Sequence, residues 1–247
     1  QPEQQAHIAF TRITQWMRRN RFPKDAQRTE LLEAVREFAQ RFPSDARAAR
    51  LLVEVANQFD RDPSLKRSLL SEANQLTRDP GLKSRIADDQ IRLNLMGVPL
   101  QLNFTDASGR PFRLEQVRGR PVVLLYASEA SAPSLAAWKV LNEALRQHPR
   151  FARVVVNLDE SRPAMERTRK ALGEGWIIGW DGLGWRSPMA RRWGINALPT
   201  AWLLDIQGKL HSLRAMEDLQ DQLSALDSPQ TSSRIVPEGP PASQTAP

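Results

Sequence analysis

Two strand signals separated by a helix signal constrain the fold of this chain more than any other feature. Residues 121–127 ("PVVLLYA") and 152–159 ("ARVVVNLD") form almost continuous apolar runs, which are typical of strands that are covered on both faces. Helical spacing of apolar residues occupies 135–148 and 162–172. Because parallel strands are joined by crossover helices, this order predicts an α/β fold with helices on both faces of the sheet.

Further strand signals come in two pairs, each separated by a short turn. The pairs are 100–106 with 111–117, and 200–206 with 209–215. The first turn contains Gly109 and the second contains Gln207 and Gly208, so both pairs predict β-hairpins. A last helix is expected at 216–226. For residues 97–227 the expected order is therefore β-β-β-α-β-α-β-β-α, in a mixed central sheet.

Residues 1–95 carry helix signals and almost no strand signal. Four similar segments punctuate this region: "RFPKDAQRTELL" (21–32), "RFPSDARAARLL" (41–52), "RDPSLK" (61–66) and "RDPGLK" (78–83). Each places a Pro where a helix could begin. In the last two segments Asp62 and Asp79 precede the Pro, which suits an N-cap followed by a proline at the first helical position. The pattern predicts a stack of short antiparallel helices.

The first two of these segments form a near-repeat at 20 residues. A helical hairpin of twice that length resembles the tetratricopeptide-like arrays of helical hairpins. An ordinary helical bundle that serves as a cap or spacer fits the same pattern, and both interpretations stay open. Either arrangement predicts contact with another protein or with the second domain.

The composition excludes several classes of site. The sequence has no cysteine, which rules out disulfides, thiolate catalysis and cysteine-based metal sites in this chain. The three histidines, His7, His148 and His211, are far apart in the sequence, so neither a metal nor a cofactor is expected. The formal net charge of +7 is spread along the chain without a nucleic-acid-binding motif, and no nucleic-acid partner is expected.

The ends of the chain and its hydropathy lead to an expected location. No stretch approaches the roughly 18 consecutive apolar residues of a membrane span. The chain begins at Gln1 rather than Met, as expected of an exported protein whose leader or anchor has been removed, or of a trimmed chain. An extracytoplasmic location, periplasmic or exported, is the prediction. Residues 228–247 are rich in Pro, Ser, Thr and Gln and are expected to form a disordered tail.

Two motifs follow each other in residues 104–128 and 190–210. The first has the pattern "D-x-x-G-[KR]-x-x-x-L" and then "R-G-[KR]"; the second has "A-x-x-[YW]-G-[IV]-x-x-[ILV]-P-T" and then "D-x-x-G-K". The positions are filled by Asp106, Gly109, Arg110, Leu114, Arg118, Gly119, Arg120, Ala190, Trp193, Gly194, Ile195, Leu198, Pro199, Thr200, Asp205, Gly208 and Lys209. Together they resemble the redoxin domains of the thioredoxin superfamily, especially the extracytoplasmic TlpA-type thiol-disulfide oxidoreductases.

The resemblance implies a thioredoxin-like domain at 97–227 with Pro199 as its cis proline. In this family the loop that contains the cis proline lies against a Cys-x-x-Cys pair at the start of the first helix of the domain. The backbone of that loop can pair with an extended substrate segment. The resemblance therefore implies a binding surface that includes Leu198, Pro199 and Thr200.

This chain departs from the family at the Cys-x-x-Cys pair itself. In the segment "EASAPSL" the two positions fall on Ser131 and Ser134, with Ala132 and Pro133 between them. A second register places Ala130 and Pro133 at the two positions, and neither register supplies a thiol. A serine hydroxyl cannot form and release an S–S bond. Either serine is instead expected to serve as an N-cap of the helix that follows.

A hydrolase that uses Ser131 as its nucleophile is disfavoured. A nucleophilic serine needs a general base within hydrogen-bond reach and a third group that orients the base. The nearest histidine in the sequence is His148, at the far end of the following helix, about 20 Å away at the helical rise per residue. Glu129 is expected to be a solvated or capping carboxylate.

Four of the seven tryptophans lie between residues 176 and 193 among several glycines. Tryptophans in such loops often form recognition surfaces, because the indole ring offers a large contact area and one N–H donor. Trp185 and Trp193 are therefore candidate binding residues. The alternative is that these rings fill space beside the sheet.

The function predicted from the sequence is protein binding or assembly by a thioredoxin-like protein that is redox-inactive. A scaffold or chaperone-like role would use the degenerate face around Ser131 and Ser134, together with the helical region. Protein partners are expected, including extended peptide segments near Pro199, and no enzymatic activity is expected. The alternative is a thiol-disulfide oxidoreductase whose two active-site cysteines have been replaced by Ser131 and Ser134.

Overall fold

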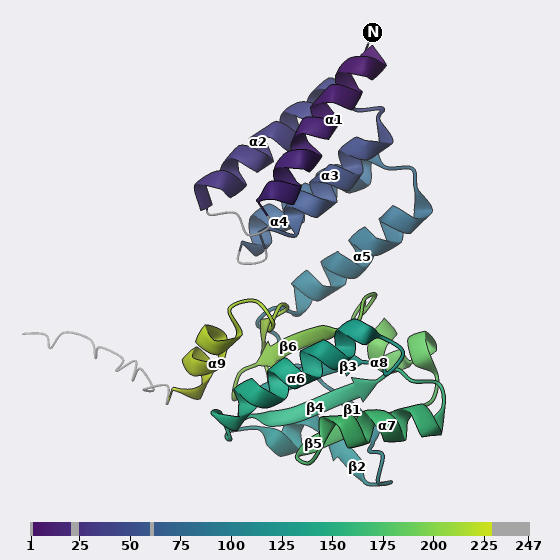
Figure 1. The fold of residues 1–247 in the computed structure, drawn as a ribbon, viewed down its shortest axis with the longest axis vertical. Coiled ribbons are helices and arrows are strands. Elements are labelled where there is room, and N and C mark those ends of the chain that lie inside the picture. Colours follow the sequence, from purple (N-terminus) through teal and green to yellow (C-terminus); the bar gives the residue numbers. More distant parts are fainter. Residues whose placement is uncertain (1, 21–24, 60–61, 229–247) are drawn as a thin grey trace, which may run out of the picture.

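The computed structural model describes residues 2–20, 25–59 and 62–228. The predicted tail at 228–247 therefore lies, apart from Ser228, outside the described residues. Figure 1 shows a stack of helices joined through α5 to a sheet with helices packed on it. The helical part consists of α1 (Pro2–Arg19), α2 (Asp25–Arg41), α3 (Ala46–Ala56), α4 (Pro63–Leu76) and α5 (Pro80–Leu95).

The helices of residues 1–95 pack through the apolar positions that the sequence spacing indicates. Helices that follow each other in the chain contact each other. Their buried core includes Leu31, Leu32, Val35, Phe38, Leu51, Leu52 and Val55. The prediction of several packed helices is confirmed, and the arrangement is compatible with both the hairpin array and the bundle.

Aspartates start three of these helices. Asp62 and Asp79 are the N-caps of α4 and α5, and a proline follows each of them in the first turn, as the sequence predicts. The prediction that a helix begins at Pro43 is wrong, because α3 begins at Ala46. There Asp45 accepts a hydrogen bond from the Arg47 N–H and is the N-cap. A side-chain acceptor for the free N–H groups therefore decides where α3 begins.

The second part contains a mixed five-stranded sheet in the order β5-β4-β3-β6-β7. Its strands are β3 (Val122–Ala127), β4 (Ala152–Asn157), β5 (Trp176–Gly179), β6 (Thr200–Leu204) and β7 (Leu210–Ser212). Strand β3 is parallel to β4 and antiparallel to β6. A separate hairpin is formed by β1 (Asn103–Thr105) and β2 (Pro111–Arg113). The predicted mixed sheet is confirmed.

Helices cover the two faces of the sheet unequally. One face packs against α6 (Ala132–Arg146), α7 (Arg162–Leu172) and α9 (Leu219–Asp227). The other face is covered by the β1–β2 hairpin and the short helix α8 (Pro188–Arg191), with Trp193 and Trp202 in its core. All six residues of β3 are buried, because this strand lies between two neighbours and under both layers.

The structure corrects three details of the predicted order. Strand β5 and helix α8 lie in the tryptophan-rich segment, where no element was predicted. Residues 114–117, predicted as strand, form the 3-10 helix η1 (Leu114–Val117). Strand β5 has only four residues, which is too short for a clear periodic signal; its pairing with β4 makes it a strand.

The helical part and the sheet part meet along α5 and the segment before Pro199. The Arg92 guanidinium donates to the carbonyl oxygen of Gly194. The amide of Asn196 donates to a carboxylate oxygen of Asp88, 3.1 Å away. Gly194 has a positive φ of 63°, and a Cβ at this position would lie 2.8 Å from the Asp88 carbonyl oxygen. Only glycine fits this close approach of two backbones.

We expect Gly194→Ala to lower the free energy of unfolding by roughly 2–4 kcal/mol, because a left-handed backbone and a clash with Asp88 both oppose the added methyl group. Gly109→Ala is the matched control: φ is 82° and no atom lies within 4 Å of the added Cβ, so only about 1–2 kcal/mol should be lost. Urea unfolding followed by circular dichroism measures both variants. Equal losses would show that Asp88 does not restrict residue 194.

Candidate functional site

The start of α6 carries Ser131 and Ser134, the residues that the sequence resemblance aligns with a Cys-x-x-Cys pair. Ser131 is the N-cap of α6, and its hydroxyl oxygen accepts a hydrogen bond from the Ser134 N–H. The predicted capping role of Ser131 is confirmed. Ala132 and Pro133, in the first turn, are exposed. The helix therefore presents a small apolar surface at its N-terminus.

Ser134 does not act as a second polar group on that surface. Its side chain is fully buried, and its hydroxyl oxygen has no hydrogen-bond partner among the described residues. A buried polar group without a partner costs about 1–3 kcal/mol. The position therefore suits a less polar group of similar size better than it suits a hydroxyl.

The loop before β6 approaches the same edge of the sheet. The peptide bond between Leu198 and Pro199 is cis, which is the bond that the family resemblance implies. Thr200 pairs with Tyr126 near the end of β3, and its hydroxyl donates to the Ala197 carbonyl oxygen at 2.8 Å. The loop and the start of α6 therefore lie at the same edge, although no hydrogen bond links Ser131 or Ser134 to the described residues 195–200.

The backbone of Leu198 is unpaired. Neither its N–H nor its carbonyl oxygen has a hydrogen-bond partner among the residues that the structure describes. Ala197 is exposed, and Leu198, Pro199 and Thr200 are half-buried. This segment can therefore accept main-chain hydrogen bonds from outside the chain.

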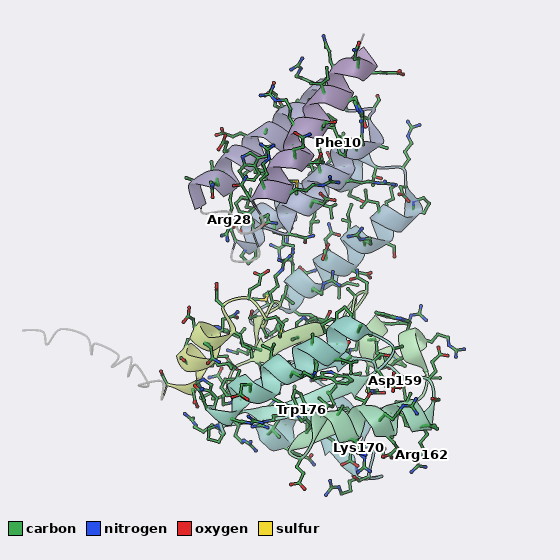
Figure 2. All side chains as sticks on the ribbon, in the orientation of Figure 1. Phe10, Arg28, Asp159, Arg162, Lys170 and Trp176 are labelled. Carbon is green, nitrogen blue, oxygen red and sulfur yellow. The ribbon has the colours of Figure 1, made fainter. Side chains whose placement is uncertain are left out.

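A buried carboxylate fixes the loop between β3 and α6. Asp159 is 4% exposed and lies just beyond β4 (Figure 2). One of its oxygens accepts from the Ser128 hydroxyl at 2.6 Å and from the Glu129 N–H at 2.9 Å. The other accepts from Asn157 at 2.7 Å and from the Thr168 hydroxyl at 2.8 Å. Four donors suit an ionised carboxylate, which only accepts.

This network ties α7 and two loops to the end of β4. The Asp159 carbonyl oxygen also accepts from the indole N–H of Trp180 at 2.6 Å. Sequence reasoning missed Asp159. The only available signal was the position of Asn157 and Asp159 directly after an apolar run, where a strand ends at the edge of the sheet.

Glu129 is engaged in an ion pair rather than being free in solvent. Its two oxygens accept from the Arg167 guanidinium at 2.5 and 2.9 Å. The hydrogen bond and the charge of Glu129 raise the pKa of Arg167. The pair ties the loop before α6 to the exposed side of α7, and no reacting group is available in it.

The hydroxyl of Tyr126 is also unavailable for chemistry. Burial raises the pKa of Tyr126 well above its ordinary value, so the hydroxyl stays protonated. It donates to the Met189 carbonyl oxygen at 3.1 Å. His148 lies beyond the far end of α6, with Nδ1 2.8 Å from an oxygen of Asp227. This geometry agrees with the sequence argument against a serine hydrolase.

Among the tryptophans, Trp185 is exposed, Trp16 and Trp180 are half-buried, and the other four are buried. Trp193 is 4% exposed and its ring lies 5.9 Å, between centroids, from that of Trp202. Trp176, also buried, donates to Asn142 from its indole N–H. Trp185 is 49% exposed. Trp193 therefore fills space in the core beside the sheet. Trp185 is the remaining candidate for contact with a partner.

No group of three or more His, Asp or Glu side chains within the described ranges is placed to hold a metal ion. Among the helices of the described ranges, none is both long and apolar enough to span a bilayer.

Comparison with known proteins identifies the fold. No family model and no curated protein matches the chain. A thioredoxin-like protein from Bacteroides caccae is similar in structure, with a TM-score of 0.52 at 16% identity, over 78% of this chain and 76% of that chain.

Two shorter structures are similar to about half of this chain. A thiol-disulfide oxidoreductase from Bacteroides fragilis has a TM-score of 0.43 at 25% identity, over 50% of this chain and 97% of that chain. The thioredoxin domain of a Bacteroides vulgatus thiol-disulfide oxidoreductase has a TM-score of 0.47 at 15% identity, over 53% of this chain and 96% of that chain. The chain thus combines a thioredoxin-like fold with N-terminal helices, as predicted, and it contains no cysteine.

The two serines should respond differently to replacement by alanine. Ser131→Ala removes the N-cap and should lower the free energy of unfolding by about 1 kcal/mol. Ser134→Ala removes a buried hydroxyl without a partner and should leave stability unchanged or raise it by up to about 1 kcal/mol. Urea unfolding compares them. A loss at Ser134 as large as that at Ser131 would mean that the Ser134 hydroxyl has a stabilising partner.

Asp159→Asn should lower the free energy of unfolding by roughly 2–4 kcal/mol, because the new amide N–H₂ faces two donors in a buried site. Thr168→Val is the control, since it removes one of the four donors and keeps the volume; about 1 kcal/mol should be lost. Thermal and urea unfolding measure both. Similar stability of Asp159→Asn and the parent chain would show that the network does not hold the loops.

Proposed function

We propose that this chain is a redox-inactive thioredoxin-like protein that binds extended segments of partner proteins, in a scaffold or chaperone-like role. The surface would consist of Ala132 and Pro133 at the start of α6 and of residues 198–200. In this proposal residues 1–95 form a helical-hairpin unit beside the thioredoxin-like unit of 97–227. The supporting observation is the unpaired Leu198 backbone at the edge where the family holds its thiols.

Two physical arguments support binding without redox chemistry. Thiol-disulfide exchange requires a thiolate, and the sequence contains no cysteine. The N–H and carbonyl oxygen of Leu198 can pair with an added extended segment in the manner of β-augmentation, in which main-chain hydrogen bonds supply affinity. Exposed Trp185 provides an apolar contact in the 3-10 helix η2 (Gly184–Arg186), which follows β5 in the chain. An extracytoplasmic location remains a prediction from the resemblance.

One observation favours the alternative, an oxidoreductase whose cysteines at positions 131 and 134 have been replaced by serine. Ser134 has a buried hydroxyl that makes no hydrogen bond to the described residues. A cysteine at this position would cost the fold little stability, because a buried cysteine behaves as a small apolar residue.

Binding is tested with a permanently unfolded, thiol-blocked protein as the probe. We expect the chain to bind it, and we expect Ala132→Arg to weaken binding about fivefold or more by placing a long charged side chain on the surface. Ala171→Arg is the matched control, since Ala171 is exposed near the C-terminal end of α7. Fluorescence anisotropy measures both. No binding, or equal binding by all three proteins, would contradict the proposal.

The double variant Ser131→Cys with Ser134→Cys separates the proposal from the alternative. If the surface has been adapted to binding, we expect the variant to fold and to reduce insulin disulfides no faster than the parent chain. Circular dichroism and thiol titration establish that the pair is formed. Rapid reduction of insulin by the variant would favour the alternative.

A further inference from the structure

The segment between β5 and the loop that contains Pro199 exposes both cations and large apolar side chains. We call this surface the η2–α8 patch, because η2, α8 and the residues that flank them supply it. Trp185 is 49% exposed and Leu183 is 40% exposed. The exposed residues of the patch are Leu183, Trp185, Arg186, Pro188, Arg191 and Arg192.

The three arginines of the patch are available to a partner. In the part of the chain that the structure describes, the side chains of Arg186, Arg191 and Arg192 have neither a hydrogen-bond partner nor an ion-pair partner. Arg191 and Arg192 share the exposed face of α8 with Pro188, because residues three and four apart are neighbours on a helix surface. The patch therefore presents several guanidinium groups beside an exposed indole ring, the two side chains most enriched at the centres of protein interfaces.

Buried polar contacts anchor the segment from below. Ser187 is fully buried, and its hydroxyl donates to a carboxylate oxygen of Asp181 at 2.6 Å. The other oxygen of Asp181 accepts from the Leu183 N–H at 2.9 Å. The hydroxyl of Tyr126 donates to the carbonyl oxygen of Met189 at 3.1 Å. The exposed side chains thus project from a fixed backbone, which lowers the entropic cost of binding.

The same tyrosine places the patch beside the proposed binding surface. Tyr126 pairs with Thr200 at the start of β6 and bonds to Met189 of α8. The helix α8 and the end of the loop that contains Pro199 are therefore neighbours at one end of the sheet. Figure 1 shows α8 at the end of the sheet opposite to α9. A segment that lies along residues 198–200 can reach the arginines of α8.

From this arrangement we propose that the η2–α8 patch selects partner segments that carry carboxylates next to an apolar side chain. The main chain of the segment pairs with Leu198, its apolar side chain packs on Trp185, and its carboxylates pair with the guanidinium groups. This inference rests on the proposed binding function and adds the chemical class of the partner.

The surroundings of the patch favour a narrow acidic segment over an anionic membrane surface. Asp181 is exposed, and exposed Glu160 approaches Gly184 so closely that a Cβ there would lie 2.8 Å from its side chain. A flat anionic surface would face these two carboxylates as well as the arginines, whereas a single segment can place its carboxylates at the guanidinium groups alone. Three cations would also supply only about 3 kcal/mol of attraction to anionic lipid.

The experiment compares two peptides with the full chain. Both are unstructured, labelled, acetylated at the N-terminus and amidated at the C-terminus. One alternates leucines with glutamates, and in the other each glutamate is replaced by glutamine, so that side chains are the only source of carboxylate. Measured by fluorescence anisotropy at low ionic strength, the glutamate peptide should bind about tenfold more tightly than its counterpart. Added salt should reduce this difference.

Two double variants separate the patch from the overall charge. Arg191→Gln with Arg192→Gln removes two adjacent, exposed arginines at the end of α8, and Arg18→Gln with Arg19→Gln removes a matching pair at the end of α1, away from α8 (Figure 1). The first should weaken binding of the glutamate peptide about fivefold, and the second less than about twofold. Equal effects would overturn the proposal in favour of nonspecific attraction to the net charge.

The apolar contact has its own readout. Both peptides carry the same leucines, so Trp185→Ala should weaken binding of both by a similar factor, about threefold or more. Unchanged binding of both peptides by this variant would overturn the role of Trp185. Phosphatidylglycerol vesicles are the probe for a lipid surface. Vesicle binding that the α8 double variant abolishes, without a preference for the glutamate peptide, would overturn the acidic segment as the ligand.

The outcomes also separate this inference from the proposed function. Equal binding of both peptides that Ala132→Arg weakens, and that the α8 double variant leaves unchanged, would overturn the role of the patch while supporting the binding function. Binding of the unfolded probe without binding of either peptide would do the same. Absence of binding to all three would contradict both.

Discussion

The burial of β3 is the constraint on which the rest of the sheet part depends. Every residue of this strand is buried, because β4 and β6 pair with its two edges and packed layers cover its two faces. A strand with no exposed edge or face has one register, since a slip of one residue would turn every side chain from the core on one face of the sheet to the core on the other face. That register pairs Tyr126, near the end of β3, with Thr200 at the start of β6, where the loop containing Pro199 ends.

The candidate surface is held by polar contacts that the chain makes around this strand. Asp159 orients the turn before α6 through Ser128 and Glu129, and Arg167 holds Glu129 from the outside. The thioredoxin-like fold is thus present in a chain that has no cysteine for thiol-disulfide exchange. Our proposal assigns the remaining main-chain groups at Leu198 to partner binding, which requires geometry but no thiolate.

The contact between α5 and Gly194 joins this surface to the helical part. Arg92 spans the junction through its bonds to Asp89 and to the Gly194 carbonyl oxygen. Residues of α5 and of the loop that contains Pro199 line a cleft beside this junction.

The sequence by itself determined the order of the main strands and helices, the N-caps at Ser131, Asp62 and Asp79, and the absence of thiol chemistry. These depend on local periodicity, on capping chemistry and on residue type. Only the tertiary structure decided that Ser134 and Trp193 are buried, that residues 176–179 form an edge strand, that Asp159 joins two loops, and that Lys66 lies in the wall of a cleft. Burial, edge pairing and charge proximity arise from segments far apart in the chain, which no local pattern records.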